Sequence, residues 1–591
     1  MVQLKLKIRS LIRTDIIIMV ICWLVCSCAN VGMPSGGQKD TEPPKVLISN
    51  PPDQSTYFEG QVIKITFNEY IQLKNINQQL IISPPLKDKP EIKLKSKTLV
   101  VDLNNPLHDS TTYSVFFGDA IADNNEGNIL KNFRYAFSTG DQIDSLRAGG
   151  TLLNAFTLKP EKDILIMLYA DKNDSAPLMD MPMYVCRTGE KGEFLITNIR
   201  KNSYKIFALK DADGNFRYDQ QGESVAFSDS LIIPDVISSF TYDTTVTKTD
   251  TLKTDSVSKR EVAIFSPLDI KLLLFDEPVK KLFMKKPDRP EKNRCNFYFS
   301  QSLSGIPEIV PLNFQPGNDW YVCELNTSSD TVICWITDTT IAKLDTLKLK
   351  INYHKTGGSG SIEQASDTSK LGFRPKPLKN NEKPKAIVLD PGCNVKRAKL
   401  LDQNQNIVFN FSAPLSSFSN DKISFFRYED SIKNPEDFRF YKDSLMLRRY
   451  YISADWTENT RYSMFIPPGT FMDISGVVND TIKADFTIQK TDYYGSIIIK
   501  ISKAGTRGII QLLNNKDIVI REKNINGSGT EKFEYLNPGN YRLKYIFDRN
   551  SNKKWDTGNY LQKIQPEKVL MYKEDIKVRS NWDVEINWEV R

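Results

Sequence analysis

Two acidic loops contain the residues whose types and spacing come closest to a chemical site. In each loop, side chains that carry oxygen stand at positions 1, 3, 5 and 9, counted from the first aspartate. Oxygens on alternate residues can converge on one hard cation such as Ca²⁺. The candidate calcium ligands are Asp211, Asp213, Asn215 and Asp219 in the first loop and Asp548, Asn550, Asn552 and Asp556 in the second.

The same loops also suit a simpler role as turns. An EF-hand loop carries a bidentate glutamate at position 12, where these loops have Gly222 and Asn559, and no helical pattern flanks either of them. Asp, Asn and Gly favour tight turns because they tolerate left-handed backbone and hydrogen-bond their own main chain. The turn is therefore the favoured interpretation and calcium the alternative. The sequence requires no cofactor, and Ca²⁺ is its one candidate.

Cys323 and Cys334 flank a predicted hairpin turn at residues 327–330. If the turn is centred there, the two cysteines lie opposite each other on neighbouring strands, close enough for a disulfide when their backbone pair is not hydrogen-bonded. The alternative is two buried thiols in a core with Trp320 and Trp335, because free cysteine is often buried. The sequence slightly favours the thiols.

No catalytic residue can be named from the sequence. The chain has two histidines, too few for a His-rich metal site and hardly enough for a Ser-His-Asp triad. Carboxylates are plentiful, but no pair is marked by its surroundings. Four aromatic residues near the C-terminus could line a carbohydrate or protein site, or fill a core: Trp555, Tyr560, Trp582 and Trp588. We therefore expect a protein that is not an enzyme.

The N-terminus has the order of a secretory signal. Basic residues precede the apolar run at residues 16–25, and the small residue Ser27 stands immediately before Cys28. The stretch 25–28 resembles the lipobox of bacterial lipoproteins, which implies cleavage before Cys28 and acylation of that cysteine. Such acyl chains would hold the protein stably on a membrane, whereas ten apolar residues are too few to span one.

Removing the signal also changes the charge. Four basic residues and Asp15 leave with it, so the net charge falls from +7 to about +4. That charge is too small for a nucleic-acid-binding surface, and we expect no nucleic-acid partner. Five cysteines remain besides Cys28, an odd number at irregular spacing, which is not the pattern of a disulfide-rich scaffold.

After a polar, Gly-rich tether, the chain consists of short β segments separated by turn residues. Many short strands of this kind predict an all-β chain of sandwiches. Residues 113–116, 119–123 and 137–140, with Gly127-Asn128, resemble the SbsA type of bacterial Ig-like domain, found in S-layer proteins and envelope lipoproteins. Ile407 to Leu415 and Tyr462 to Phe465 echo that domain, and residues 296–303 echo it more weakly.

A second kind of repeat surrounds the two acidic loops. Gly192-Glu-Phe followed by a short turn and Tyr204-Lys-Ile resembles the transthyretin-like sandwich of carboxypeptidase regulatory domains. Residues 533–556 repeat the plan of residues 194–219, and both copies end in a similar strand, at 269–274 and 583–588. Within the first copy, residues 241–260 are rich in Thr, Asp, Ser and Lys, which predicts an exposed or disordered insertion.

The predicted fold class is all-β, with tandem Ig-like and transthyretin-like sandwiches after a lipoprotein signal peptide. The expected boundaries are 1–27 signal peptide, 28–42 tether, 43–140 SbsA-type Ig-like, 147–280 transthyretin-like with an insertion at 236–262, 285–373 and 384–489 Ig-like, and 493–591 transthyretin-like; residues 374–384 have the composition of a stiff linker.

These features together predict a structural role in a bacterial envelope. The chain resembles multi-domain lipoproteins of Bacteroidetes, which implies an outer-membrane protein held through lipid on Cys28. We expect a structural or accessory subunit of an outer-membrane protein complex; the alternative is a surface adhesin or glycan-binding protein. The acidic cluster that marks surface export in such lipoproteins is missing after Cys28, so the membrane face stays open.

Overall fold

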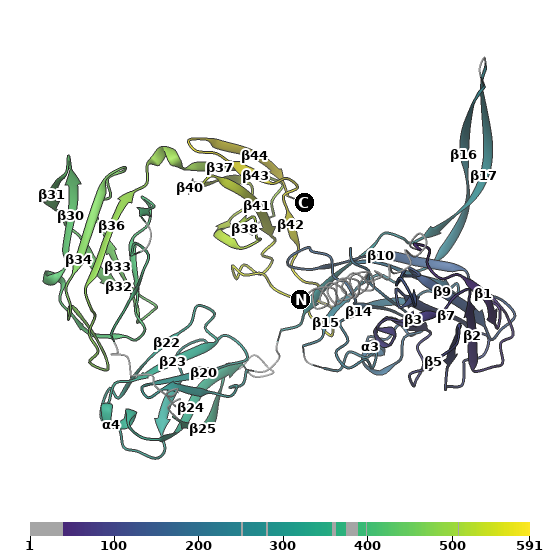
Figure 1. Cartoon of the computed structure of the whole chain (residues 1–591). Coiled ribbons are helices and arrows are strands. Elements are labelled where there is room, and N and C mark those ends of the chain that lie inside the picture. The colour runs from purple at the N-terminus through teal and green to yellow at the C-terminus, as the bar shows by residue number, and fades with distance from the viewer. Residues whose placement is uncertain are drawn as a thin grey trace, which may run out of the picture. The chain divides into compact units, whose positions relative to one another are not determined.

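A computed structural model describes residues 40–220, 222–249, 252–278, 282–356, 362–373, 388–396, 399–505 and 507–590 (Figure 1). The predicted signal peptide, Cys28 and the 374–384 linker lie outside these ranges. The described chain is nearly all β, which confirms the predicted all-β class. Its sheets fall into five successive parts of the sequence, which we call the N-terminal, second, third, fourth and C-terminal segments.

The N-terminal segment folds around alternating side chains. In β2 (Val62–Phe67), for example, Ile63, Ile65 and Phe67 are buried in its core. Its sheets have the orders β1-β2-β6-β5, β4-β7-β9 and β3-β8. The elements are β1 Val46–Asn50, β2, β3 Ile71–Leu73, α2 Ile76–Gln79, β4 Ile81–Ser83, β5 Glu91–Lys95, β6 Thr98–Asp102, β7 Thr112–Gly118, β8 Ile121–Asp123 and β9 Phe133–Ser138.

The contacts between Cα atoms divide the chain into two compact units, of which the first contains the N-terminal segment. Of the described residues, 40–145 and 197–200 form one compact unit, and those of 146–196 and 201–590 form the other. Within the first unit, the Asn198 amide donates to the Asp144 carbonyl at 3.0 Å, and the Ser114 hydroxyl donates to Asn198 at 2.9 Å.

The second segment is built on one long series of paired strands in the order β12-β11-β14-β15-β18-β10-β13. Its first strand, β10, pairs in parallel with its last, β18, from Gly150 opposite Ile270 to Asn154 opposite Leu274. The elements are β10 Leu146–Asn154, β11 Leu165–Tyr169, α3 Ala176–Met179, β12 Tyr184–Arg187, β13 Glu193–Ile199, β14 Lys205–Leu209, β15 Ser224–Phe227, β16 Asp235–Thr249, β17 Leu252–Ser266 and β18 Ile270–Asp276.

The insertion predicted at 236–262 contains a hairpin of β16 and β17, which pair only with each other among the described strands (Figure 1). Sequence reasoning expected exposed or disordered chain because apolar residues are few. Thr and Val are branched at Cβ, however, and such residues favour strands.

The third and fourth segments each pair two main sheets around one core. The third has the orders β19-β20-β23-β22 and β21-β24-β25. Its elements are β19 Asp288–Glu291, β20 Arg294–Tyr298, β21 Glu308–Pro311, β22 Tyr321–Leu325, β23 Thr331–Ile336, α4 Thr339–Ala342, β24 Thr346–Thr356 and β25 Ile362–Gly372.

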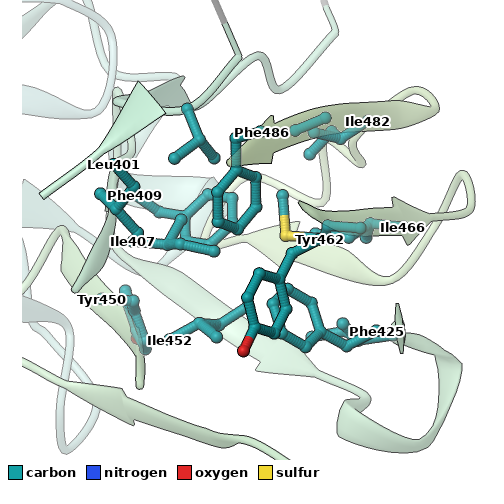
Figure 2. Packing of buried hydrophobic residues seen from close by; sticks show 14 of the residues in the cluster. Leu401, Ile407, Phe409, Phe425, Tyr450, Ile452, Tyr462, Ile466, Ile482 and Phe486 are labelled. Carbon is teal, nitrogen blue, oxygen red and sulfur yellow. The ribbon is translucent and has the colours of Figure 1, made fainter. Parts of the chain in front are cut away.

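The fourth segment has the orders β26-β28-β33-β32, β27-β36-β34-β30-β31 and β29-β35. Its core contains many aromatic side chains, among which Phe425, Tyr462 and Phe486 pack together (Figure 2). Its elements are β26 Gly392–Cys393, β27 Leu400–Leu401, β28 Ile407–Asn410, β29 Leu415–Phe418, the 3₁₀ helix η1 Asn420–Lys422, β30 Ser424–Glu429, β31 Ile432–Pro435, β32 Arg439–Lys442, β33 Arg449–Ser453, β34 Arg461–Ile466, β35 Phe471–Asp473 and β36 Ile482–Ile488.

The C-terminal segment repeats the plan of the second. Its first strand, β37, pairs in parallel with its last, β44, from Ser496 opposite Asp583 to Ser502 opposite Glu589. The similar closing strands expected from the sequence therefore occupy the same place in both segments. The elements are η2 Thr491–Tyr493, β37 Gly495–Ser502, β38 Gly508–Asn514, β39 Val519–Ile525, β40 Gly529–Leu536, β41 Gly539–Ile546, β42 Val569–Met571, β43 Ile576–Val578 and β44 Asp583–Glu589.

Candidate functional site

The first acidic loop follows β14 and folds around Asp211. One carboxylate oxygen of Asp211 accepts the Gly214 N–H at 2.7 Å, and the other accepts the Phe216 N–H at 2.9 Å. The Asn215 amide donates to Asp213 and to Asp219, each at 3.0 Å. Gly214 has a φ of +79°, which its missing side chain permits. The four predicted ligands therefore lie together in one loop.

A buried glutamate that sequence reasoning missed closes this loop. Glu223 is 2% exposed, and its two carboxylate oxygens accept the Ala212 and Gln220 N–H groups at 3.1 and 3.2 Å. Oxygens of Asp211, Asp213 and Glu223 all lie within 4.8 Å of one another. The EF-hand pattern has its glutamate at loop position 12, whereas Glu223 stands one residue later.

The C-terminal loop is held in the same way. The oxygens of Asp548 accept the Asn552 and Lys553 N–H groups at 3.1 and 3.0 Å. Glu567, also 2% exposed, accepts the Arg549 N–H at 2.7 Å and the Asp556 N–H at 3.1 Å. Burial raises the pKa of the Glu567 carboxyl group. The amides of Asn550 and Asn552 both donate to Asp556, so the predicted ligands again lie in one loop.

These contacts fit both interpretations of the loops. The main-chain N–H groups already bind the central carboxylates, as expected of a turn. Oxygens of three carboxylates within 4.8 Å could also bind a hard cation, and in the described part of the chain only the first loop brings three such groups that close. Calcium binding stays a prediction.

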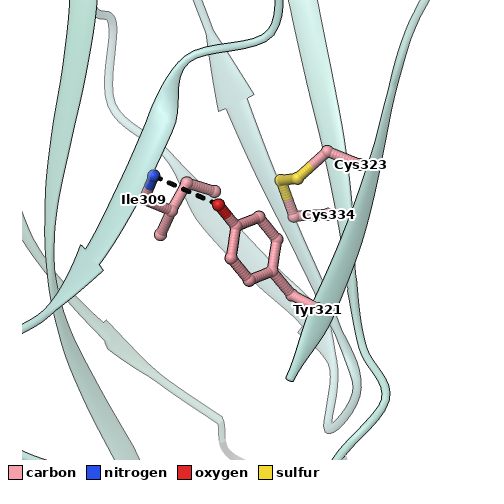
Figure 3. The surroundings of a disulfide bond; sticks show 4 residues. All are labelled: Ile309, Tyr321, Cys323 and Cys334. Atoms are coloured by element: carbon pink, nitrogen blue, oxygen red, sulfur yellow. Dashed lines mark hydrogen bonds between the residues drawn. A yellow bond between two sulfur atoms is a disulfide. The ribbon is translucent and has the colours of Figure 1, made fainter. Parts of the chain in front are cut away.

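The structure joins Cys323 of β22 and Cys334 of β23 in a disulfide, with Cα atoms 4.2 Å apart (Figure 3). The hairpin register places them opposite each other, as the turn predicted, and the preference for two thiols was wrong. Nearby, the Ile309 N–H of β21 donates to the Tyr321 hydroxyl at 3.4 Å, which links the two sheets of the third segment.

A third cysteine lies in the same row. Cys295 of β20 stands opposite Cys334, so the three cysteines occupy adjacent positions on three neighbouring strands. The Cα distance identifies Cys323 and Cys334 as a close, non-hydrogen-bonded pair, which makes Cys295 and Cys334 the wider, hydrogen-bonded pair. Burial raises the pKa of the Cys295 thiol to about 12. The strand register therefore explains why Cys334 forms its disulfide with Cys323 and not with Cys295. The Cys295 side chain stays a protonated thiol.

The four C-terminal aromatic residues do not form one site. Trp588 belongs to the core of the C-terminal segment, and Tyr560 is fully buried. Trp555 is partly buried and its indole N–H donates to the Glu567 carbonyl at 3.0 Å, whereas Trp582 is 58% exposed. Trp588 therefore has the second of the two roles expected from the sequence, that of filling a core.

Among the described residues, no helix is long and apolar enough to cross a membrane. The predicted lipidation site, Cys28, lies outside the described ranges.

The architecture is that of a tandem β-sandwich protein. Residues 40–139 match the family model of the bacterial Ig-like domain, which agrees with the Ig-like domain expected at 43–140. Comparison with curated proteins returned no match.

Solved structures similar to this chain show low identity and low TM-scores. The major pilin subunit of Bacillus cereus is 9% identical, with 75% of this chain and 98% of that chain covered and a TM-score of 0.14. The BSP domain of a biofilm-associated protein is 7% identical, with 88% and 96% covered and a TM-score of 0.14. Domains 1–6 of the surface-layer protein SbsC are 11% identical, with 91% and 67% covered and a TM-score of 0.13.

Proposed function

We propose that this chain is a lipid-anchored structural subunit of a bacterial outer membrane, acting as an accessory part of a membrane-protein complex. The observation that carries the proposal is the order of the N-terminus, where an apolar run ends in Ser27-Cys28 ahead of a bacterial Ig-like domain. An acylated cysteine there would hold the protein on the membrane.

Two further features support the proposal. The Cys323–Cys334 disulfide suits an oxidising compartment such as the bacterial periplasm or cell surface. A chain of β-sandwiches offers binding surfaces and sets the distances between them. The sequence has two histidines and marks no pair of nucleophile and base for catalysis. The partner that fits this role is a β-barrel protein of the same membrane.

The test replaces Cys28 and compares it with a matched control. Cys28→Ser should abolish incorporation of a labelled fatty acid and move the protein from the membrane to the soluble fraction, whereas Cys26→Ser, two residues earlier, should leave both unchanged. A wild-type protein that incorporates no label refutes the lipid anchor, and a Cys28→Ser protein that still incorporates the label refutes Cys28 as its site.

The partner is tested by crosslinking in intact outer membranes, followed by detergent extraction and affinity purification. The proposal expects one β-barrel protein to co-purify in constant ratio. Recovery of the chain alone, at full extraction, rejects the accessory-subunit role.

The alternative is a surface adhesin or glycan-binding protein, which the exposed Trp582 favours because aromatic faces anchor such ligands. Protease treatment of intact cells should then remove the protein, and Trp582→Ala should weaken glycan binding. An accessory subunit on the inner face of the membrane would survive the protease.

A further inference from the structure

The two acidic loops differ in the length of chain between their last aspartate and the glutamate that closes them, and the longer stretch builds a contact between distant parts of the chain. In the second segment, Asp219 and the closing Glu223 are four residues apart. In the C-terminal segment, the equivalent Asp556 and Glu567 are eleven apart. The additional residues lie in a strap that we define as residues 557–566. Because both loops are braced alike, the strap is not needed to hold its own loop.

The strap places one aromatic ring into the second segment. Tyr560 is fully buried, and its ring centroid lies 4.8 Å from that of Phe207 in β14 and 5.2 Å from that of Phe227 in β15. Both pairs are edge-to-face, the arrangement that aromatic rings favour. Burial raises the pKa of the Tyr560 hydroxyl. The ring therefore fills a place prepared by two neighbouring strands.

The main chain of the strap fits the end of β18 closely. A Cβ at Gly558 would lie 2.6 Å from the Phe275 ring, so only glycine allows this approach. The Thr557 hydroxyl donates to the Asp276 carbonyl at 2.6 Å, and the Tyr560 N–H donates to the Glu277 carboxylate at 2.6 Å. The contact thus satisfies polar groups as well as burying rings.

Ion pairs also join the second and C-terminal segments. Lys563 of the strap lies 2.5 Å from Asp174, which also binds Lys205 of its own segment. Away from the strap, Lys159 of the second segment lies 2.6 Å from Asp517.

Rings also meet beside that second ion pair. The Phe156 ring centroid lies 4.9 Å from that of Trp555, and the Lys544 ammonium lies 3.7 Å from the Phe156 ring centroid. The contact between the second and C-terminal segments therefore extends beyond the strap.

We propose that the strap is an inserted docking element whose partner is the second segment of the same chain. It closes the chain on itself, so that the second and C-terminal segments form one body and the third and fourth segments are held between them. The proposal does not depend on the proposed function.

Carbodiimide crosslinking of the full chain tests the closure, because this reagent couples a lysine to a carboxylate only when they are in contact. Mass spectrometry should find Lys563–Asp174 and Lys159–Asp517 crosslinks. In an equal mixture of ¹⁴N- and ¹⁵N-labelled protein, these crosslinks should carry a single label, which shows that they form within one chain.

Tyr560→Ala and Gly558→Ala should each lower the yield of both crosslinks about tenfold or more, because the first empties the aromatic pocket and the second collides with Phe275. Two crosslinks report that the segments stay folded: Lys205–Asp174 within the second segment and Lys523–Glu531 within the C-terminal segment.

The matched control is Tyr493→Ala, which removes a partly exposed tyrosine outside the strap and should change nothing. The proposal is overturned if the wild-type protein gives neither crosslink, if the crosslinks carry mixed labels, or if both strap variants retain wild-type yields.

Discussion

Removing the Cys323–Cys334 disulfide should destabilise the third segment by a predictable amount. The bond closes a loop between residues 11 apart in sequence. Chain-entropy arguments give about 3 kcal/mol for a loop of that size. The double variant Cys323→Ala/Cys334→Ala removes the bond together with two sulfur atoms, that of buried Cys334 and that of partly buried Cys323, so the packing loss must be separated from the loss of the crosslink.

Cys295→Ala is the matched control because it removes a buried sulfur from the same row of the sheet and leaves the disulfide in place. Hydrogen exchange, measured by mass spectrometry on peptides of β20, β22 and β23, reports opening of this segment separately from the others. Relative to the control, the double variant should exchange about a hundredfold faster, as a change of about 3 kcal/mol requires. A difference below about threefold refutes the entropic argument.

The single variant Cys323→Ala tests the register argument. It leaves Cys334 beside the free thiol of Cys295, but these two form the wider pair of the ladder. Both thiols should therefore remain reduced under air and react with iodoacetamide once the protein is unfolded. A Cys295–Cys334 disulfide in peptide maps of this variant contradicts the assignment of close and wide pairs.

Three further outcomes follow from other parts of the molecule. Gly150→Ala should destabilise the second segment by about 3 kcal/mol or more in urea unfolding, because its Cβ would lie 1.9 Å from the Ile270 carbonyl oxygen. The control Gly529→Ala should be nearly neutral. Equal effects of the two substitutions on stability contradict the predicted clash. Calorimetry should show Ca²⁺ binding that Glu223→Gln weakens if the first loop holds the ion, and the absence of heat at millimolar Ca²⁺ leaves the loop a turn. Contacts with Lys205 and Lys563 lower the pKa of Asp174, so its stabilising contribution is present above the ordinary value of 3.8 and is lost as the pH falls through the lowered value. Protein taken to pH 2 and returned to pH 6 before the carbodiimide is added should therefore give the Lys563–Asp174 crosslink in undiminished yield, and a lost yield contradicts a reversible contact.

Local patterns in the sequence predicted much of the fold. Alternation and turn residues identified the sandwiches, and the turn at 327–330 placed Cys323 opposite Cys334. The repeat comparison matched two closing strands, and the structure places both in parallel beside the first strand of their segment. Each of these features depends on residues near one another in sequence or on a pattern that recurs.

The features that were missed depend on contacts across long separations or on an imposed spacing. The EF-hand pattern does not select Glu223, because its glutamate stands at position 12 and Glu223 stands at position 13. The burial of Tyr560 could not be foreseen because its partners, Phe207 and Phe227, lie in another segment and leave no local pattern. The sequence does contain one signal of the strap. The spacing from Asp556 to Glu567 is longer than the spacing from Asp219 to Glu223, which marks an insertion in the second of two otherwise similar loops.

The parallel pairing of first and last strands has a mechanical consequence. In the second and C-terminal segments, the chain enters along one strand and leaves in the same direction along its neighbour. Pulling on the two ends drags these strands past each other lengthwise, so the evenly spaced hydrogen bonds of the ladder share the load. They must break together, whereas a hairpin pulled apart at its open end loses its bonds one after another. Both segments should therefore resist a pull on their two ends better than a hairpin opened from its end.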